Sequence, residues 1–583
     1  MSRVISIGRQ DYEKLRMKNN FYVDKTHFIK EWWEADDEVT LITRPRRFGK
    51  TLNMSMLEKF FSTDYAGRSD LFEGLFIWKE TDFRKLQGTY PVIFLSFADV
   101  KERDFSQARK MICRNIQELY NKFDFLLESD ALNENEKKAF RDVSEDMENS
   151  RAASSLRALS NYLAHYHKNR TIILLDEYDT PMQEAYVNGY WDDMSAFIRS
   201  LFNATFKTNP YLERGLMTGI TRISRESIFS DLNNLEVVTT ISDKYTDCFG
   251  FTETEVFTAL DEYEMSDKKA EVKAWYDGFT FGSTTDIYNP WSIINYLDKK
   301  EASAYWTNSS SNSLVGKLIQ KGSKTVKSDF ELLLRGETLE IEIDEQIVYG
   351  ELPWKRNAIW SLLLTSGYLK VLKRESPLPT SQCRYVLALT NWEVKRMFES
   401  MARNWFVGSE DDYNDFIKAL LSDDLEAMNI YMNDVALTTF SSFDTGKQPS
   451  KSAPERFHAV KAITKNLDGP NSSACFYHGI VLGLMVELSD RYVLNSNRES
   501  GFGRYDVMLE PKTPQDDAII LEFKVFQPKK EKDLEETVRA ALAQIEEKQY
   551  AASLKAKGVA SERIRTYGFA FEGQKVLIQS GQA

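Results

Sequence analysis

The sequence predicts an α/β protein of several domains, with a mainly parallel sheet domain, a helical middle region and a smaller α/β domain. Its 583 residues exceed what one hydrophobic core usually holds. Short apolar runs alternate with helical patterns in the first 245 residues, which is typical of a parallel sheet. A stretch rich in Ser, Pro, Gly and Lys has the composition of a linker. We therefore predict a parallel-sheet domain at 1–245, a lid subdomain at 246–300, a helical or winged-helix-like region at 301–440, the linker at 441–454 and an α/β domain at 455–583.

The first domain repeats one pattern along the chain. Short apolar runs that end in polar residues predict buried strands at 38–43, 90–100, 170–179 and 215–223. The stretches between these runs space Met, Leu, Ile and Phe as helices do. Strands that alternate with helices in this way favour crossover connections and a parallel sheet.

The pattern changes in the lid and the middle region. Thr252, followed three residues later by Glu255, fits a capping box at the start of a helix. An aromatic, turn-rich stretch follows at 275–297. Residues 300–435 are mostly helical in pattern, and the exception at 357–398 reads as helix, hairpin and helix. That order is typical of a winged-helix-like module, and an ordinary packing module shares it.

Composition and charge narrow the class of protein. The chain is 42% hydrophobic and 28% charged, as expected for a soluble globular protein. A net charge of −13 argues against a protein that only coats nucleic acid, so any such contact is expected to be a local patch. Residues 455–583 carry 18 basic and 18 acidic side chains, which makes this segment the less repulsive surface for a polyanion.

Targeting signals and cysteines point to the cytoplasm. The first twenty residues lack an apolar core of signal-peptide length, and no apolar stretch is long enough to span a bilayer. The four cysteines are far apart and form no C-x-x-C pair, which argues against a disulfide framework and a zinc ribbon. We expect a cytoplasmic protein without membrane contact, and the sequence leaves the oligomeric state open, a homo-oligomer included.

The stretch LITRPRRFGKT at 41–51 ends like a phosphate-binding loop. The usual pattern is G-x-x-x-x-G-K-[ST], and Arg44 stands where its first glycine falls. Gly49 lies where the backbone must approach the phosphates, Lys50 would reach the β- and γ-phosphates, and Thr51 would ligate Mg²⁺. A chance Gly-Lys-Thr is the alternative. The other loop residues assigned to the nucleotide site are Arg46, Arg47 and Phe48.

Two acids follow the third predicted strand. Asp176 is suited to hold Mg²⁺ through water, and Glu177 to polarise an attacking water. The alternative is a strand that simply runs into a surface turn. Loop and acids in this order, each after a strand, favour nucleotide binding. Beyond the fourth strand, Arg222 is a candidate to stabilise charge on the γ-phosphate, and a surface arginine is equally consistent with the pattern.

The last domain contains a second pattern. Strands are predicted at 504–510 and 517–526, joined by a polar turn. Glu522 and Lys524 are two residues apart, so they share one face of the second strand, while Phe523 faces the core. An apolar strand that holds an acid and a lysine on one face indicates a site, because burying unpaired charge is costly. A half-exposed surface ion pair is the alternative.

Metal-assisted phosphodiester cleavage accounts for this pattern. Asp506 and Glu522 offer the hard oxygen ligands that Mg²⁺ or Mn²⁺ prefers. Lys524 would position the attacking water or stabilise charge in the transition state. A long helix is expected at 531–554 and adds two polar candidates, of which the first is assigned to the catalytic set: Gln544 and Tyr550.

Motifs along nearly the whole chain resemble those of a bacterial family that joins an AAA-ATPase-like domain to a domain of the PD-(D/E)XK nuclease superfamily. In that family the R-P-R-R-F-G-K-[ST] loop is the normal form, which accounts for Arg44. The motifs that carry the resemblance are YVDKT, RPRRFGKT, LLDEYD, GITRIS, FGFTETEV, WYDGF, YNPWS, LLLTSGYL, FYHGIVLGL, SNRESGFGRYDVML, EFKV and AQIEEKQY.

The resemblance implies a P-loop ATPase fold and a restriction-endonuclease-like fold, with ATP and Mg²⁺ as cofactors and Mn²⁺ as a further option at the second site. We expect a hydrolase acting on nucleic acid, with DNA the expected partner. A role in phage defence or a mobile element is a further hypothesis that overlaps these activities. The superfamily often adds an acid from the first helix of the nuclease domain. Here Ala474 and Cys475 stand where that acid is expected, and Glu487 comes a few turns late.

Two hypotheses follow. The first is a protein that binds and hydrolyses ATP and whose nucleotide state moves the lid and the middle region and so regulates a metal-dependent nuclease. The second is a nucleotide-switched binding or signalling protein that uses an inactive nuclease-like domain for recognition. The missing first-helix acid favours the second, and metal binding that requires Asp506 and Glu522 separates the two.

Overall fold

The computed structural model describes residues 3–581 without these segments: 224–227, 230–231, 310–312, 321, 345–351, 353–354, 376–382, 406–409, 440–480, 482–484, 486–487, 489–490, 497–498, 501–502, 505, 514, 529 and 574. The predicted linker at 441–454 lies outside the described residues. Two compact units are present, one formed by Met1–Leu318 with Gly336–Met397 and the other by Ile319–Arg335 with Phe398–Ala583. No described helix has the length and apolar character needed to cross a bilayer.

The first unit is built on a parallel sheet, as the sequence predicted. All its strand pairs are parallel and its strand order is β2-β3-β4-β1-β5. Every residue of β1 and β3 is buried, because helices cover both faces of the sheet. The bounds are Val39–Thr43 for β1, Val92–Ser96 for β2, Thr171–Asp176 for β3, Leu212–Gly219 for β4 and Leu235–Val238 for β5.

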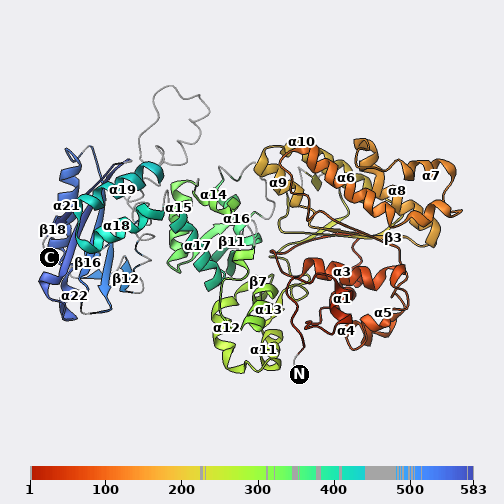
Figure 1. Ribbon diagram of the computed structural model, residues 1–583, viewed down its shortest axis with the longest axis horizontal. Helices are drawn as coiled ribbons and strands as arrows, with labels where there is room; N and C mark the ends of the chain where they lie inside the picture. The colour runs from red at the N-terminus through yellow and green to blue at the C-terminus, as the bar shows by residue number, and fades with distance from the viewer. Residues whose placement is uncertain are drawn as a thin grey trace. The chain divides into compact units, whose positions relative to one another are not determined.

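Successive residues of the strands belong to opposite faces of this sheet. Leu41 and Ile173 pack in one hydrophobic cluster and their neighbours Ile42 and Ile172 in another, as the period of two requires. Figure 1 shows short helices together with α3 on one side of the sheet and long helices on the other. The first set is α1 (Tyr12–Met17), α3 (Lys50–Phe61), α4 (Phe76–Lys79) and α5 (Thr81–Arg84), and the second is α6 (Phe105–Asn121), α8 (Asn149–His167) and α10 (Trp191–Phe206).

The lid has its own small antiparallel sheet. Its strand order is β6-β8-β7, and the predicted capping box is present, with Thr252 and Glu255 bonded reciprocally at the start of α11. Asn289 caps α13 by accepting hydrogen bonds from two backbone N–H groups. The bounds are Phe251–Thr252 for β6, Glu253–Glu262 for α11, Phe279–Phe281 for β7, Thr284–Tyr288 for β8 and Pro290–Lys299 for α13.

The helix–hairpin–helix order predicted for 357–398 is present. It consists of α16 (Arg356–Thr365), β10 (Leu369–Glu375), β11 (Arg384–Leu389) and α17 (Trp392–Trp405), and β9 (Leu339–Glu342) pairs with β11. In a winged helix that reads DNA, the helix that enters the groove must be exposed. Every residue of α16 from Ala358 onward is buried, which favours the packing alternative over a nucleic-acid reader.

The second unit is built on a mixed sheet with the strand order β12-β15-β16-β17-β18. Among the described pairs of this sheet, β16 and β17 are parallel and the other three pairs are antiparallel. Figure 1 shows α18 (Glu410–Ser422) and α19 (Leu425–Thr439) beside this sheet, and they share a hydrophobic cluster with its strands. The strands are Tyr492–Ser496 (β12), Val507–Pro511 (β15), Ala518–Val525 (β16), Ile564–Glu572 (β17) and Lys575–Gly581 (β18).

The long helix expected at 531–554 is wrong in its extent. The structure has α21 at Leu534–Glu547 and a short α22 at Ala552–Ala556. Gln549 between them has a left-handed backbone with φ of 53°, which ends α21. The N–H of Tyr550 then returns to the carbonyl of Ile545 at 3.2 Å. This turn brings Tyr550 back beside Gln544, a proximity that a continuous helix would not give.

Arg44 anchors the end of β1 to the segment that leads to the lid. Its side chain is fully buried and contacts residues 239–245. Its guanidinium donates to the carbonyl oxygens of Thr239 at 2.7 Å, Lys244 at 3.2 Å and Tyr245 at 3.3 Å, and also to that of Thr43. It lies over the ring of Phe281 from β7 at 4.6 Å. Burial lowers the pKa of Arg44 to about 10, so the group stays charged at neutral pH.

Replacing Arg44 by alanine should destabilise the first unit by about 3–5 kcal/mol, because several buried carbonyls lose their donor and a cavity remains. Thermal unfolding measures the loss, and hydrogen exchange in residues 239–250 locates it. Arg103→Ala is the matched control, since Arg103 is exposed, and its effect should stay within about 0.5 kcal/mol. Equal losses in the two variants would contradict the anchoring role of Arg44.

Candidate functional site

The phosphate-loop candidate adopts the local geometry that its sequence demands. The chain leaves β1 at Thr43 and enters α3 at Lys50. Gly49 immediately precedes the helix with φ of 84°, a left-handed conformation that glycine adopts without strain. The first N–H groups of α3 are left without helical partners, and this end of a helix favours anions. Strand, loop and helix therefore follow the order that a phosphate site requires.

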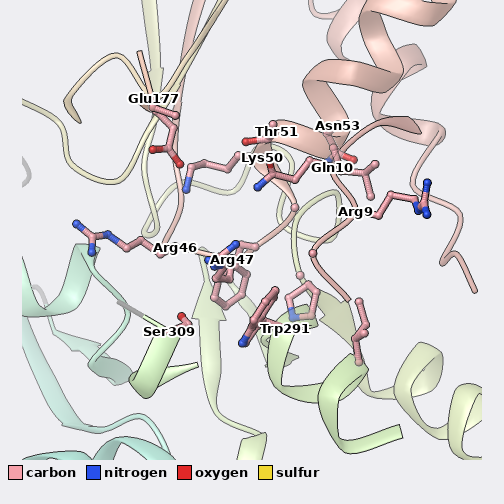
Figure 2. A pocket seen from close by; sticks show the side chains of 18 of the residues that line it. Arg9, Gln10, Arg46, Arg47, Lys50, Thr51, Asn53, Glu177, Trp291 and Ser309 are labelled. Atoms are coloured by element: carbon pink, nitrogen blue, oxygen red, sulfur yellow. The ribbon is translucent and has the colours of Figure 1, made fainter. Parts of the chain in front are cut away.

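A cavity of about 710 Å³ opens at this loop (Figure 2), a size typical of small-molecule sites. Loop residues from Arg46 to Asn53 line it, and the guanidinium of Arg47 lies 4.3 Å from the ring of Trp291 in α13. Phe48 is nearly fully buried and packs against Phe279 and Phe281, so it anchors the loop to the lid. The amino-terminal segment, which sequence reasoning missed, also lines the cavity, with Ile5, Ser6, Gly8, Arg9 and Gln10.

Thr51 and Asp176 lie in contact. The hydroxyl of Thr51 donates to Asp176 Oδ2 at 2.7 Å, and the hydroxyl of Thr218 donates to Asp176 Oδ1 at 2.6 Å. Lys50 Nζ donates to the carbonyls of Arg44 and Pro45, both at 3.0 Å. Burial raises the pKa of Asp176 and lowers the pKa of Lys50, while three nearby carboxylates oppose the shift at the lysine. The structure thus brings the loop lysine, the loop threonine and the strand-end acid together.

Glu177 lines the cavity, whereas Asp176 lies behind it. Its backbone has φ of 52°, a conformation that costs energy for a residue with a side chain. Its carboxylate accepts a hydrogen bond from the Thr180 hydroxyl at 3.2 Å. Figure 2 shows Glu177 and Lys50 among the side chains of the same cavity.

The next two residues of the LLDEYD motif position the end of β4, a role that sequence reasoning missed. Asp179 Oδ2 accepts from the backbone N–H groups of Ile220 and Thr221 at 3.0 and 2.9 Å. Tyr178 donates to the carbonyl of Thr221 at 2.7 Å. Arg222 is half-buried and is not among the residues that line the cavity. Its predicted contact with the γ-phosphate therefore has no support in this geometry.

The chemistry of the loop and its neighbours suits ATP with Mg²⁺. Lys50 and the arginines supply positive charge to the cavity, and α3 begins there. The hydroxyl of Thr51 and the carboxylate of Asp176 are the oxygen donors that Mg²⁺ prefers. Within the described residues the ammonium group of Lys50 donates to two loop carbonyls, and a phosphate group would be an anionic acceptor for it.

The second candidate site lies on the sheet of the second unit. Asp506 directly precedes β15, and its Oδ2 accepts from the N–H of Phe523 at 2.9 Å. Glu522 on β16 is 3% exposed, which means that its carboxylate is enclosed by protein. Burial and the neighbouring Asp506 carboxylate raise the pKa of Glu522, and burial raises the pKa of Asp506. Phe523 packs in the hydrophobic cluster, on the face predicted from the sequence.

Gln544 joins the polar residues of this site. Its amide oxygen accepts from Lys524 Nζ at 2.6 Å, and its amide nitrogen donates to Glu522 Oε1 and, at 2.9 Å, to the hydroxyl of Tyr550. Glu522 Oε2 is buried and makes no hydrogen bond with the part of the chain that the structure describes. A buried carboxylate oxygen of this kind beside a second carboxylate fits a divalent cation. Glu487 lies outside the described residues.

Comparisons with known proteins match both sites to families. Residues 6–229 match the family model described as "Predicted AAA-ATPase", and residues 475–581 match the model described as "PD-(D/E)XK nuclease superfamily". The chain is also 27% identical over 304 residues to a protein of Azotobacter chroococcum mcd 1 described as "Uncharacterized protein in vnfD 5'region". That match covers 52% of this chain and 53% of the relative, so the chain spans about half the length of the curated protein it matches.

The two family matches coincide with the two sites. The first includes the loop, Asp176 and Glu177, and the second includes Asp506, Glu522, Lys524 and Gln544. The resemblance drawn from the sequence is confirmed: the matches find a predicted AAA-ATPase domain at 6–229 and a domain of the PD-(D/E)XK nuclease superfamily at 475–581.

Proposed function

We propose that the protein binds and hydrolyses ATP and that its nucleotide state regulates metal-dependent cleavage of nucleic acid, with DNA as the expected substrate. The observation that carries the nuclease activity is the enclosed Glu522 carboxylate, one oxygen of which lacks a hydrogen bond among the described residues, beside Asp506. The ATPase activity is supported by the cavity at the loop and the contact between Thr51 and Asp176.

At the first site, different residues would bind the phosphates, hold the metal ion and orient the water. Lys50 and the N–H groups at the start of α3 would bind phosphate oxygens, and Arg46 and Arg47 would add positive charge. Thr51 and Asp176 would hold Mg²⁺, which neutralises charge on the phosphates when bound. Glu177 would orient water for hydrolysis, since its carboxylate faces the cavity.

At the second site Asp506 and Glu522 would hold Mg²⁺ or Mn²⁺. The bound ion would activate a water and stabilise charge on the scissile phosphate. Lys524 would hold the water or the phosphate, and Gln544 would set the position of the Lys524 ammonium group and of the Glu522 carboxylate. The buried surroundings strengthen each of these electrostatic interactions.

Contacts within the first unit link the phosphate-loop candidate to the lid and the lid to the start of α17, which supports the proposed regulation. The carbonyl of Arg46 accepts hydrogen bonds from Asn289 in the lid at 3.2 Å and from the indole of Trp306 at 3.0 Å. The buried carboxylate of Glu393, at the start of α17, accepts from the hydroxyl of Ser292 at 2.8 Å and from the N–H of Thr307 at 3.1 Å. Helix α17 begins in the first unit and ends in the second, so a lid movement would act on it.

The competing function is a nucleotide-switched binding protein with an inactive nuclease-like domain. The observation that favours it is the absence of an acid at Ala474 and Cys475, where the superfamily often places one. ATP binding without cleavage of any nucleic acid, under all metal conditions, would support this function over the first.

Glu177→Gln should leave ATP binding close to wild type and lower ATP hydrolysis by roughly 10²–10⁴-fold, because the water loses its base. Phosphate release and binding of a fluorescent ATP analogue measure the two effects. Glu184→Gln is the matched control, since Glu184 lines the same cavity and loses the same charge. An equal fall in ATP hydrolysis in both variants would mean that the loss of cavity charge causes the effect, and it would contradict the proposed role of Glu177.

Lys524→Ala and Glu522→Gln should each lower cleavage by roughly 10²-fold or more, because the first removes a positive charge at the phosphate and the second a metal ligand. Cleavage of linear and circular DNA with Mg²⁺ or Mn²⁺ measures it. Glu510→Gln is the control, since Glu510 lies on β15 and pairs with the exposed Lys557. Cleavage that survives in Lys524→Ala and Glu522→Gln would place the activity elsewhere.

Lys50→Ala should remove the effect of ATP on DNA cleavage, which we expect to be roughly 5–150-fold in the wild type, the usual size of coupling between sites. Cleavage rates are compared without nucleotide, with ATP and with a non-hydrolysable analogue. Wild-type cleavage that is the same under all three conditions would eliminate regulation while leaving both separate activities intact.

A further inference from the structure

A cluster of four metal-ligating residue types, none of them assigned to either proposed activity, lies beside the nucleotide cavity. His27 and Glu31 are four residues apart on α2 (His27–Glu34), so they lie on one face of that helix. Asp247 and Cys248 come from the segment just before β6. One nitrogen, one sulfur and two carboxylate oxygens from these residues all lie within 4.8 Å of one another. Two elements 216 residues apart in sequence thus place four different donors around one point.

The contacts inside the cluster are long, and one buried polar atom has no hydrogen bond within the described residues. His27 Nε2 is enclosed by protein and makes no hydrogen bond within the described residues, and Asp247 Oδ1 is 3.5 Å from it. The thiol of Cys248 is 3.5 Å from Glu31 Oε2 and 4.0 Å from Asp247 Oδ1. A buried imidazole nitrogen that lacks a hydrogen bond and lies within 4.8 Å of carboxylate oxygens and a thiol has surroundings that suit a metal ligand.

The donor set selects the kind of ion. Thiolate and imidazole favour borderline ions such as Zn²⁺, whereas Mg²⁺ and Ca²⁺ prefer oxygen alone. Four donors match the tetrahedral coordination that Zn²⁺ takes in structural sites. Glu31 is exposed and about half of the Asp247 side chain is exposed, so both carboxylates have room to rotate toward an ion. Binding would release the Cys248 proton to solvent.

The position of the cluster connects it to the nucleotide cavity. Cys248 lines that cavity, and its carbonyl accepts a hydrogen bond from Asn53 of α3 at 2.9 Å. Two residues later the N–H of Gly250 donates to the carbonyl of Phe48 in the phosphate-loop candidate at 3.3 Å. An ion held here would fasten α2 to the start of the lid.

We propose that His27, Glu31, Asp247 and Cys248 form a site for a divalent transition-metal ion, with Zn²⁺ the best match, and that the ion stabilises the junction between the parallel-sheet domain and the lid. The proposal does not depend on either proposed activity.

The full-length protein is stripped with a chelator and titrated with Co²⁺, whose thiolate complexes absorb in the near ultraviolet. We expect a thiolate-to-cobalt band that saturates at one equivalent and disappears when Zn²⁺ is added. The ligands proposed at the two catalytic sites are a hydroxyl and carboxylates, so an ion held by those ligands does not give the band.

Cys248→Ala should abolish the band, and Glu31→Gln, an exposed change that spares the fold, should weaken Co²⁺ affinity at least about tenfold. Cys113→Ala is the matched control, because Cys113 is buried in a different hydrophobic cluster, and its titration should equal that of the wild type. A wild-type protein without the band, a band that persists in Cys248→Ala, or unchanged affinity in Glu31→Gln would each overturn the proposal.

Discussion

The buried guanidinium of Arg44 constrains the whole first unit. A charge without a carboxylate partner is stable in the interior only if its donors are satisfied, and here backbone carbonyls from β1 and from residues 239–245 satisfy most of them. Those carbonyls must therefore stay in place around the loop. This interaction fixes the start of the phosphate-loop candidate. Arg44 stands at the usual position of the first glycine, but its side chain does not line the cavity, which stays open for a ligand.

The LLDEYD motif is likewise held in place by hydrogen bonds to distant parts of the chain. Alternate residues face different ways at the end of β3, so Asp176 lies behind Thr51 while Glu177 lines the cavity. Tyr178 and Asp179 then hold the chain beyond β4. These hydrogen bonds link the end of β3 to the start of α3 and to the residues that follow β4. A ligand in the cavity would therefore act on all three segments through few contacts.

Local patterns in the sequence predicted much of the fold and several contacts. The parallel strands, the capping box at Thr252, the hairpin before α17 and the core orientation of Phe523 follow from spacing alone. What escaped prediction depends on distant parts of the chain. The direction of the Arg44 side chain needs the 239–245 segment, and the amino-terminal segment carries no periodic signal for the cavity it lines. The end of α21 at Gln549 depends on tertiary contacts, since the polar residues there are equally compatible with a continuing helix.

The order in which the chain enters the two units limits how the protein can be divided into fragments. The second unit gathers 319–335 with the whole stretch from 398 onward, and the 336–397 segment between them belongs to the first. Helices α18 and α19 share the hydrophobic cluster of the sheet, although both precede the family match at 475–581. A fragment cut at the start of that match would leave an apolar sheet face open to water and prone to association. The compact unit that contains the nuclease-like sheet is thus discontinuous in sequence.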